Sequence, residues 1–144
     1  GLGAPVGSAL AGSGDLIREA HRHRKVLGGG MREAGVIAAA ALYALEHHVD
    51  RLADDHANAQ RLAEGIRRID VLDLDPDPVD TNLVFFRVDP AWGSAAEFCA
   101  RLKEDGLLML ATAPTMVRAV THLDVDGDAV DRAIRIMQAA ARRR

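Results

Sequence analysis

The chain carries three consecutive glycines, Gly28 to Gly30, followed by Met31 and Arg32. Glycine inside a helix costs about 1 kcal/mol relative to alanine, so this run predicts a break between two helices. Arg32 would then stand at the start of the second helix, where free backbone N–H groups and a guanidinium together favour an anion such as a phosphate. The alternative is a simple helix-to-helix turn whose arginine faces water.

A second arginine, Arg118, lies in a segment that alternates like a β-strand, over residues 117–123. This alternation puts Arg118, Val120 and His122 on one face. An arginine among apolar positions of a short strand is costly to bury unless an anion meets it, and a guanidinium can bind a carboxylate with two hydrogen bonds. Arg118 is therefore a candidate clamp for a ligand carboxylate. The alternative is an arginine on an edge strand that reaches solvent.

The histidines and acidic residues do not form a metal motif. The chain has no His-Glu-x-x-His pattern, and its single cysteine, Cys99, cannot form a cysteine pair. The segment 124–128 resembles a calcium loop only superficially, because Ala129 and Arg135 occupy the positions of its glycine and its glutamate. Helix capping explains these aspartates better, and we predict no metal site.

Composition restricts the possible partners. A net charge of −3 argues against a nucleic-acid partner, and no apolar run approaches the roughly 20 residues of a membrane span. A single cysteine forms no internal disulfide, which suits a reducing compartment. We therefore expect a soluble cytoplasmic protein with neither a membrane nor a nucleic-acid partner.

The first part of the chain, residues 1–70, is predicted to be mainly helical. In order, we expect a short strand over 8–11 and helices over 15–25, 36–45 and 49–69, with Ser13 or Asp15 as the first N-cap. The helix over 36–45 is apolar on all sides, which is typical of burial in a core or between subunits. The helix over 49–69 has a polar face, including Asp54 and Asp55, that we expect to be solvated.

The second part, residues 71–144, predicts a compact two-layer α+β unit. Asp75 to Pro78 interrupts regular structure, and the apolar period changes there from that of a helix to that of a strand. In order, we expect strands over 71–74 and 82–88, a helix over 94–105, strands over 107–111 and 117–123, and a final helix capped by Asp126 or Asp128. This β-β-α-β-β-α order favours a partly antiparallel sheet.

Five blocks of the sequence, in this order and spacing, resemble the low-specificity L-threonine aldolases, which are pyridoxal-phosphate enzymes with the aspartate aminotransferase fold. The blocks are Gly1–Ser8, Arg24–Arg32, Asp54–Ala59, Thr81–Phe86 and Arg118–Asp124. They extend over nearly the whole chain.

The resemblance implies an α/β fold of which this chain is the C-terminal part. Residues 1–70 would form the end of the large cofactor-binding domain, and residues 71–144 would form the small C-terminal α+β domain. In the family, the lysine that carries the cofactor directly precedes the block matched by Gly1–Ser8, so the chain as given lacks that lysine. Members of the family are typically homotetramers.

The resemblance also implies roles for particular residues. Arg32 would contact the cofactor phosphate, and Arg118 would bind the substrate α-carboxylate. Lys25 matches a family lysine near the active site, although its catalytic role stays open. Glu33 departs from the glutamine usual in the family, and a negative charge beside Arg32 either weakens the phosphate contact or is a harmless variation.

The implied reaction is the cleavage of L-threonine or L-allo-threonine to glycine and acetaldehyde with pyridoxal 5'-phosphate as cofactor. Two alternatives stay open at this point. One is a non-catalytic module that binds an anion through Arg32 and Arg118. The other is a related pyridoxal-phosphate lyase that acts on other β-hydroxy amino acids.

Overall fold

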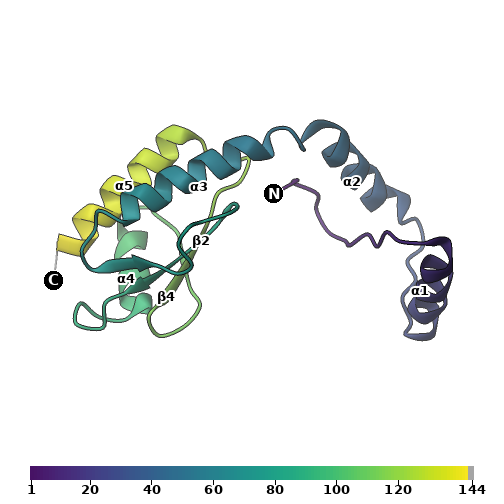
Figure 1. The fold of residues 1–144 in the computed structure, drawn as a ribbon, viewed down its shortest axis with the longest axis horizontal. Helices are drawn as coiled ribbons and strands as arrows, with labels where there is room; N and C mark the ends of the chain where they lie inside the picture. The colour runs from purple at the N-terminus through teal and green to yellow at the C-terminus, as the bar shows by residue number, and fades with distance from the viewer. Residues whose placement is uncertain (143–144) are drawn as a thin grey trace. The chain divides into compact units, whose positions relative to one another are not determined.

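The computed structural model describes residues 1–142 of the chain. These residues form, in order, α1 (Gly14–Val26), α2 (Gly35–His47), α3 (Leu52–Ile66), β1 (Leu72–Leu74), β2 (Leu83–Val88), α4 (Ala95–Glu104), β3 (Leu110–Ala111), β4 (Met116–Val120) and α5 (Gly127–Arg142), as Figure 1 shows. The order of helices and strands agrees with the sequence-based expectation except for one strand near the N-terminus.

The described elements divide into two compact units, residues 2–50 and the chain from Arg51 onward. The division falls before α3, so this helix packs with the strands that follow it. The assignment of residues 1–70 and 71–144 to the end of a large domain and to a small domain stays a prediction.

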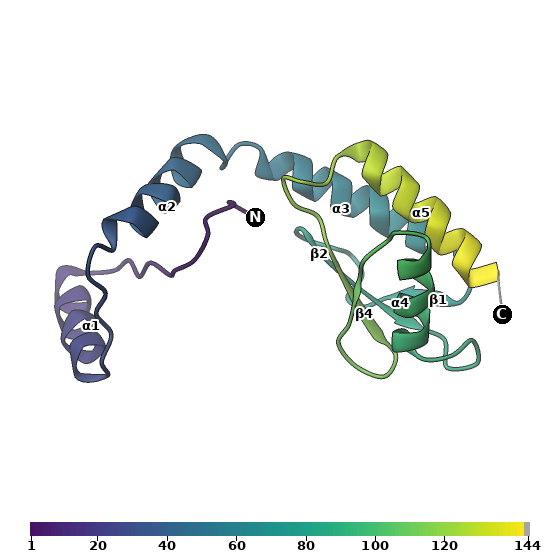
Figure 2. The same ribbon diagram turned by 180° about the vertical axis from the view of Figure 1, so that it is seen from behind.

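The unit from Arg51 onward contains an antiparallel sheet with the strand order β1-β2-β4-β3 among its described residues. Helices α3 and α4 pack against one face of this sheet, and α5 packs on these two helices and adds to the same core, as can be followed in Figure 2. Side chains alternate between the two faces of a strand. The buried residues Val84, Phe86 and Val88 of β2, and Val117 and Ala119 of β4, therefore face the helices.

Aromatic side chains join α4 to the sheet in this core. Phe98 of α4 is fully buried and meets the ring of Phe86 edge to face, with 6.3 Å between the ring centroids. Trp92 packs against Phe98 in the same manner at 5.1 Å, and its indole N–H donates a hydrogen bond to the carbonyl of Ala141 in α5. These contacts hold α4 and α5 on the same face of the sheet.

Helix starts follow the capping signals in the sequence. The Ser13 side chain accepts a hydrogen bond from the backbone N–H of Leu16 and caps α1. Ser94 and Glu97 form a complete capping box at the start of α4. The Asp126 carboxylate accepts a hydrogen bond from the N–H of Ala129 at the start of α5. The alternative caps Asp15 and Asp128 lie inside the first turns of their helices.

In the unit of residues 2–50, the strand expected over 8–11 does not form, and this prediction was wrong. A strand needs a hydrogen-bonded neighbour, and the described residues of this unit contain no other strand. The run of small apolar residues over 8–11 is compatible with a strand, but a sequence run does not show whether a neighbouring strand is present.

Helix α2 exposes most of its apolar surface on this chain. Among its large apolar residues, Val36, Leu42, Tyr43 and Leu45 are all more than half exposed. Only Ala44 of this helix is buried. Burial in a core of this chain is therefore not observed, and burial between subunits stays a prediction. Across the described residues, no helix has both the length and the apolar character needed to span a membrane.

Candidate functional site

Arg118 lies near the middle of β4, on the sheet face that α3, α4 and α5 leave open. It pairs across the ladder with Phe85 of β2 and with Leu110 of β3. Because β4 has a neighbour on each side, Arg118 is not on an edge strand, and the alternative of an edge-strand arginine is wrong. Val120 shares its face as predicted, whereas His122 lies beyond the end of β4.

The Arg118 guanidinium has no hydrogen-bond or ion-pair partner among residues 1–142. Its side chain is half-buried, and its Nε is withdrawn from solvent without a hydrogen-bond partner among the described residues. A buried donor without an acceptor costs free energy, and arginine cannot lose its charge to avoid that cost. A carboxylate that accepts from Nε and a terminal nitrogen would satisfy both the charge and the missing hydrogen bond.

The surroundings of Arg118 on this open face are mainly apolar. The ladder positions on the same face hold Leu83 and Val120, which pair with each other, and Met116, which pairs with Arg87. Apolar walls lower the local dielectric constant and strengthen the attraction between a guanidinium and an anion. The open face therefore combines an apolar surface with one incompletely paired cation near its centre.

The glycine run lies between α1 and α2 in the other unit. Gly28 has a φ of +82° and follows the C-cap of α1, a position that favours glycine. A β-carbon on Gly29 would lie 2.9 Å from the carbonyl oxygen of Arg24, and one on Gly30 would lie 3.1 Å from Nζ of Lys25. The helix break is confirmed, and its glycines admit close contacts with the last turn of α1.

Arg32 follows this glycine run in a turn that ends at α2. The helix begins three residues later, at Gly35, so Arg32 precedes the helix instead of starting it. The side chain of Arg32 is exposed, and none of the ion pairs among the described residues includes it. The N-cap residue Ala34 offers no side-chain acceptor, so the α2 N-terminus keeps donors available to an anion.

Within the unit of residues 2–50, the structure brings Lys25 back toward the glycines that precede Arg32, while Arg118 belongs to the other unit. Glu33 adopts a φ of +57°, which non-glycine residues rarely adopt. This backbone conformation lies in the turn between Arg32 and the first turn of α2.

The family model of the beta-eliminating lyases matches residues 1–91. The chain belongs to the beta-eliminating lyase family.

Relatives of this beta-eliminating lyase chain include two curated proteins from distant organisms. The chain is 45% identical to the probable low-specificity L-threonine aldolase 2 of Arabidopsis thaliana over 124 residues, which are 85% of this chain and 35% of that protein. It is 46% identical to the low specificity L-threonine aldolase of Escherichia coli K12 over 125 residues, 87% of this chain and 35% of that protein. The chain thus spans about a third of the length of these relatives.

Solved structures with the same fold include aminotransferases. The aminotransferase TlmJ from Streptoalloteichus hindustanus superposes with a TM-score of 0.63 at 14% identity, over 73% of this chain and 36% of that one. Ornithine delta-aminotransferase from Plasmodium falciparum gives a TM-score of 0.58 at 18% identity, over 75% of this chain and 28% of that one. The expected fold class, part of an aspartate aminotransferase-like α/β fold, is confirmed.

Three polar residues of this beta-eliminating lyase chain had no assigned role in the sequence analysis. Thr121, Asn82 and Asp55 belong to three of the blocks that carry the family resemblance, and the structure brings them together at the ends of β2 and β4. Asp55 was expected to be solvated, which was wrong, because it is fully buried and forms an ion pair with Arg51. Shared membership in the blocks was the signal that could have grouped these residues.

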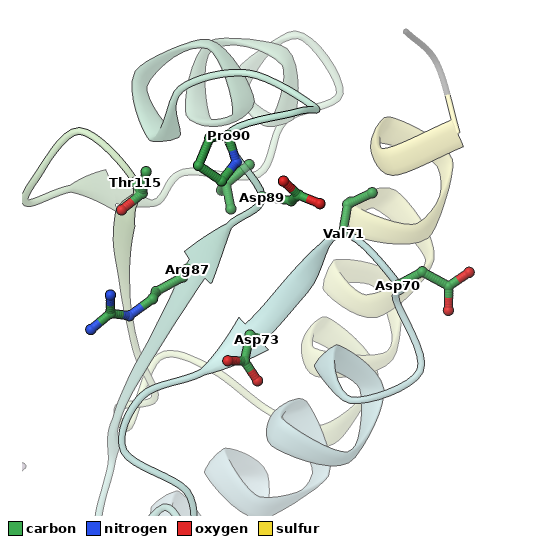
Figure 3. A pocket seen from close by; sticks show the side chains of 8 residues that line it. Asp70, Val71, Asp73, Arg87, Asp89, Pro90 and Thr115 are labelled. Carbon is green, nitrogen blue, oxygen red and sulfur yellow. The ribbon is translucent and has the colours of Figure 1, made fainter.

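A separate pocket of this chain lies beside β1 and β2. Its lining includes Asp70, Asp73, Arg87, Asp89 and Thr115. Figure 3 shows its carboxylates spread around the pocket without converging on one point. No group of acidic, histidine or cysteine side chains able to hold a metal ion occurs among the described residues. Elsewhere, burial raises the pKa of the Cys99 thiol, which disfavours its nucleophilic thiolate form.

Proposed function

We propose that this chain is the C-terminal part of a pyridoxal-phosphate-dependent aldolase that cleaves L-threonine or L-allo-threonine to glycine and acetaldehyde. The observation that carries this proposal is the half-buried Arg118, whose Nε has no acceptor among the described residues and whose neighbours on the open face are mainly apolar. Curated relatives with identities of 45% and 46% are named as low-specificity threonine aldolases, which supports the substrate class.

Arg118 would hold the α-carboxylate of the amino acid. Two parallel hydrogen bonds from a planar guanidinium fix both the position and the orientation of a carboxylate. Fixing the carboxylate also fixes the rotation about Cα and therefore determines which Cα bond is aligned for cleavage. The flanking apolar residues Phe85 and Leu110 would exclude water from this contact.

The residues near the glycine run fit the phosphate of the cofactor. Arg32 is exposed and without an ion-pair partner among the described residues, the α2 N-terminus lacks a side-chain cap, and the Lys25 ammonium lies beside Gly30. Together they would neutralise a phosphate and donate hydrogen bonds to it. When bound, pyridoxal phosphate supplies the electron sink that breaking the Cα–Cβ bond requires. Lys25 lies near this site without an assigned proton transfer.

We extend this proposal to the assembly and location of the protein. The exposed apolar residues of α2 support a homo-oligomer, and the family resemblance supports a tetramer. The single free cysteine supports a cytoplasmic location. Residues 1–70 would belong to the large cofactor-binding domain and residues 71–144 to the small domain.

The test is a comparison of arginine variants in the complete protein that carries this chain. A hydrogen bond to a charged group contributes about 1.5–3 kcal/mol, and Arg118→Ala removes both proposed bonds to the carboxylate, so the KM for L-threonine should rise by about 100-fold or more. The bound cofactor, measured by absorbance, should be retained. Arg118→Lys should recover only part of the loss, because a lysine cannot form the planar two-bond contact.

Arg87→Ala is the matched control for this experiment. Arg87 lies on the same open face of the sheet and is exposed. Unlike Arg118, it already has an ion-pair partner within the chain, Asp75. Its removal should leave the KM for threonine within about twofold. An unchanged KM in Arg118→Ala, or an equal rise in both variants, would refute the proposed role of Arg118.

A further inference from the structure

Thr121 follows β4 directly, and its side chain is almost completely buried although it is polar. All of its hydrogen-bonding groups have partners in other segments. Its hydroxyl donates to the backbone carbonyl of Asp55 in α3 at 2.7 Å, and its N–H donates to the carbonyl of Asn82 at 3.0 Å. Its own carbonyl accepts a hydrogen bond from the Asn82 side-chain amide at 2.9 Å. We call Thr121, Asn82 and Asp55 the Thr121 anchor.

The Thr121 anchor fixes the end of the strand that carries Arg118. Leu83 and Val120 form the last residue pair between β2 and β4, and the two bonds between Asn82 and Thr121 extend this pairing by one position. A strand that slips by one residue exchanges its two faces. These bonds therefore help to keep Arg118 on the open face of the sheet.

The hydroxyl of Thr121 connects this strand to a helix that is itself held firmly. Asp55 is fully buried, and its carboxylate forms an ion pair with Arg51 one turn earlier in the chain. The hydrogen bond that Arg51 donates to the Asp55 carboxylate raises the pKa of Arg51 above its ordinary value. Further along α3, the Asn58 side chain donates to the carbonyl of Val125 at 3.0 Å, which ties the segment after β4 to the same helix.

Packing alone does not explain a threonine at this position. Valine has nearly the same shape, favours strands more strongly and carries no polar group that must be satisfied. A buried hydroxyl adds a directional contact, which a methyl group cannot provide. Here that contact sets the position of the β4 end relative to α3.

We propose that Thr121, with Asn82 and the Asp55 carbonyl, is a positioning residue for Arg118. This inference rests on the proposed function of Arg118 as the carboxylate clamp. Arg118 and Thr121 lie three residues apart, with the arginine on the open face and the threonine on the helix-facing side. The anchor holds the buried side of the segment so that the guanidinium meets the carboxylate in the correct orientation.

The experiment uses four variants of the complete, cofactor-loaded protein: Thr121→Val, Thr121→Ser, Arg118→Ala and the double variant Thr121→Val/Arg118→Ala. Because small misplacements of a binding group reduce its effect strongly, Thr121→Val should raise the KM for L-threonine and the calorimetric dissociation constant for glycine by about tenfold. Its kcat should change less than about twofold, and its cofactor content should stay the same. Thr121→Ser keeps the hydroxyl and should stay within about twofold of the parent.

Thr112→Val is the matched control, because Thr112 is an exposed threonine before β4 whose hydroxyl bonds only locally, to the carbonyl of Met116. In the Arg118→Ala background, Thr121→Val should add less than about twofold to the KM, because a residue that acts through Arg118 has no effect once Arg118 is absent. A thermal unfolding scan of each variant separates this coupling from a loss of folded protein.

The outcomes separate this inference from the proposed function. If Arg118→Ala raises the KM but Thr121→Val does not, or if the two effects simply multiply, the inference is overturned and the proposed function stands. If Arg118→Ala leaves the KM unchanged, both are overturned. An increase in KM in Thr121→Val that is rescued by serine and absent in the Arg118→Ala background supports the inference.

Discussion

The Asp55 side chain and the Nε of Arg118 are both withdrawn from water, and they differ in whether the chain supplies a partner. Asp55 is fully buried and forms an ion pair with Arg51. Arg118 has a buried Nε without a hydrogen-bond partner among the described residues. A buried charge that the chain satisfies has a structural role, whereas one that it leaves unsatisfied on an open face indicates a ligand.

Arg32→Ala should weaken the binding of pyridoxal phosphate to the complete protein by about 10- to 100-fold, because a charge-assisted contact to a phosphate is lost. The measurement is cofactor affinity from absorbance or fluorescence titration of the apoprotein. Arg22→Ala is the control, since Arg22 is an exposed cation on the same chain within α1. Equal affinity in the Arg32 variant and the parent would contradict the phosphate role.

Glu97 should give the folded chain a defined pH dependence. Hydrogen bonds from the N–H and the hydroxyl of Ser94 hold the pKa of Glu97 below its ordinary value of 4.5. A lowered pKa in the folded state stabilises the fold above the unfolded value, and this stabilisation is lost as the pH falls through the folded value. Glu97→Gln should therefore lower the unfolding midpoint at pH 7 and reduce its fall on acidification.

Thermal unfolding between pH 7 and pH 3 checks this prediction. Glu104→Gln is the control, because Glu104 is the last residue of α4 and takes no part in the capping box. Parallel pH curves for Glu97→Gln and the parent would show that the capping box does not supply this pH dependence.

The close contact between α3 and α5 depends on the absence of a side chain at Gly65. A β-carbon there would lie 2.5 Å from Cγ1 and 2.9 Å from Cγ2 of Ile134, which are the branches of a stiff side chain. Gly65→Ala should destabilise the chain by about 1–3 kcal/mol, although alanine is the better helix former. The measurement is the free energy of unfolding in urea.

Two further variants make this prediction specific. Gly35→Ala at the start of α2 has no atom within 4 Å of the added carbon, so it should be neutral or slightly stabilising. Adding Ile134→Ala to Gly65→Ala should recover part of the loss by making room for the new methyl group. No recovery in the double variant would contradict a steric cause.

Much of the secondary structure could be predicted from the sequence, because periodicity and capping are local. Ser13, Ser94 and Asp126 mark helix starts through contacts within one turn, and all three are observed. The interior position of β4 could not be predicted, because strand order depends on contacts between distant segments. The burial of Asp55 could not be predicted for the same reason, since its backbone carbonyl contacts Thr121, more than sixty residues later in the chain.

The candidate site was predicted in part. The residue type and alternation around Arg118 correctly indicated an arginine on one face with apolar neighbours. The roles of Arg32 and Lys25 came from the family resemblance, and the structure adds the uncapped α2 N-terminus and the approach of Lys25 to Gly30. The Thr121 anchor could not be predicted, because a threonine in a strand pattern gives no sign that its hydroxyl reaches a helix carbonyl.

The chain exposes many large apolar side chains, and contiguous exposed apolar surface is typical of contacts with other protein segments. The exposed side chains occur on α2, on the open sheet face and in the segment before β3, and include Val36, Leu42, Tyr43, Leu45, Leu83, Leu108 and Leu110. The relatives are about three times longer than the matched segment, so segments outside this chain could cover these surfaces.

We therefore expect the chain of residues 1–144 by itself to bind the hydrophobic dye ANS strongly, and the complete protein to bind it weakly, per mole of chain. Fluorescence titration of both proteins measures this difference. Replacing Leu42 and Leu45 by glutamine should reduce dye binding to the isolated chain. Weak dye binding by the isolated chain would show that these surfaces need no cover.

The interior position of β4 has a dynamic consequence. Local opening of a protein begins at elements with few bonds, such as frayed ends and edge strands, and reaches interior strands last. β4 is bonded to β2 along one side and to β3 on the other, and the segment after it is bonded to α3. Amide hydrogens around Arg118 should thus exchange with solvent among the slowest in this unit. Arg118, the residue proposed to bind the substrate carboxylate, thus lies on a strand that opens late. Substrate binding would therefore be retained during local fluctuations that detach β1.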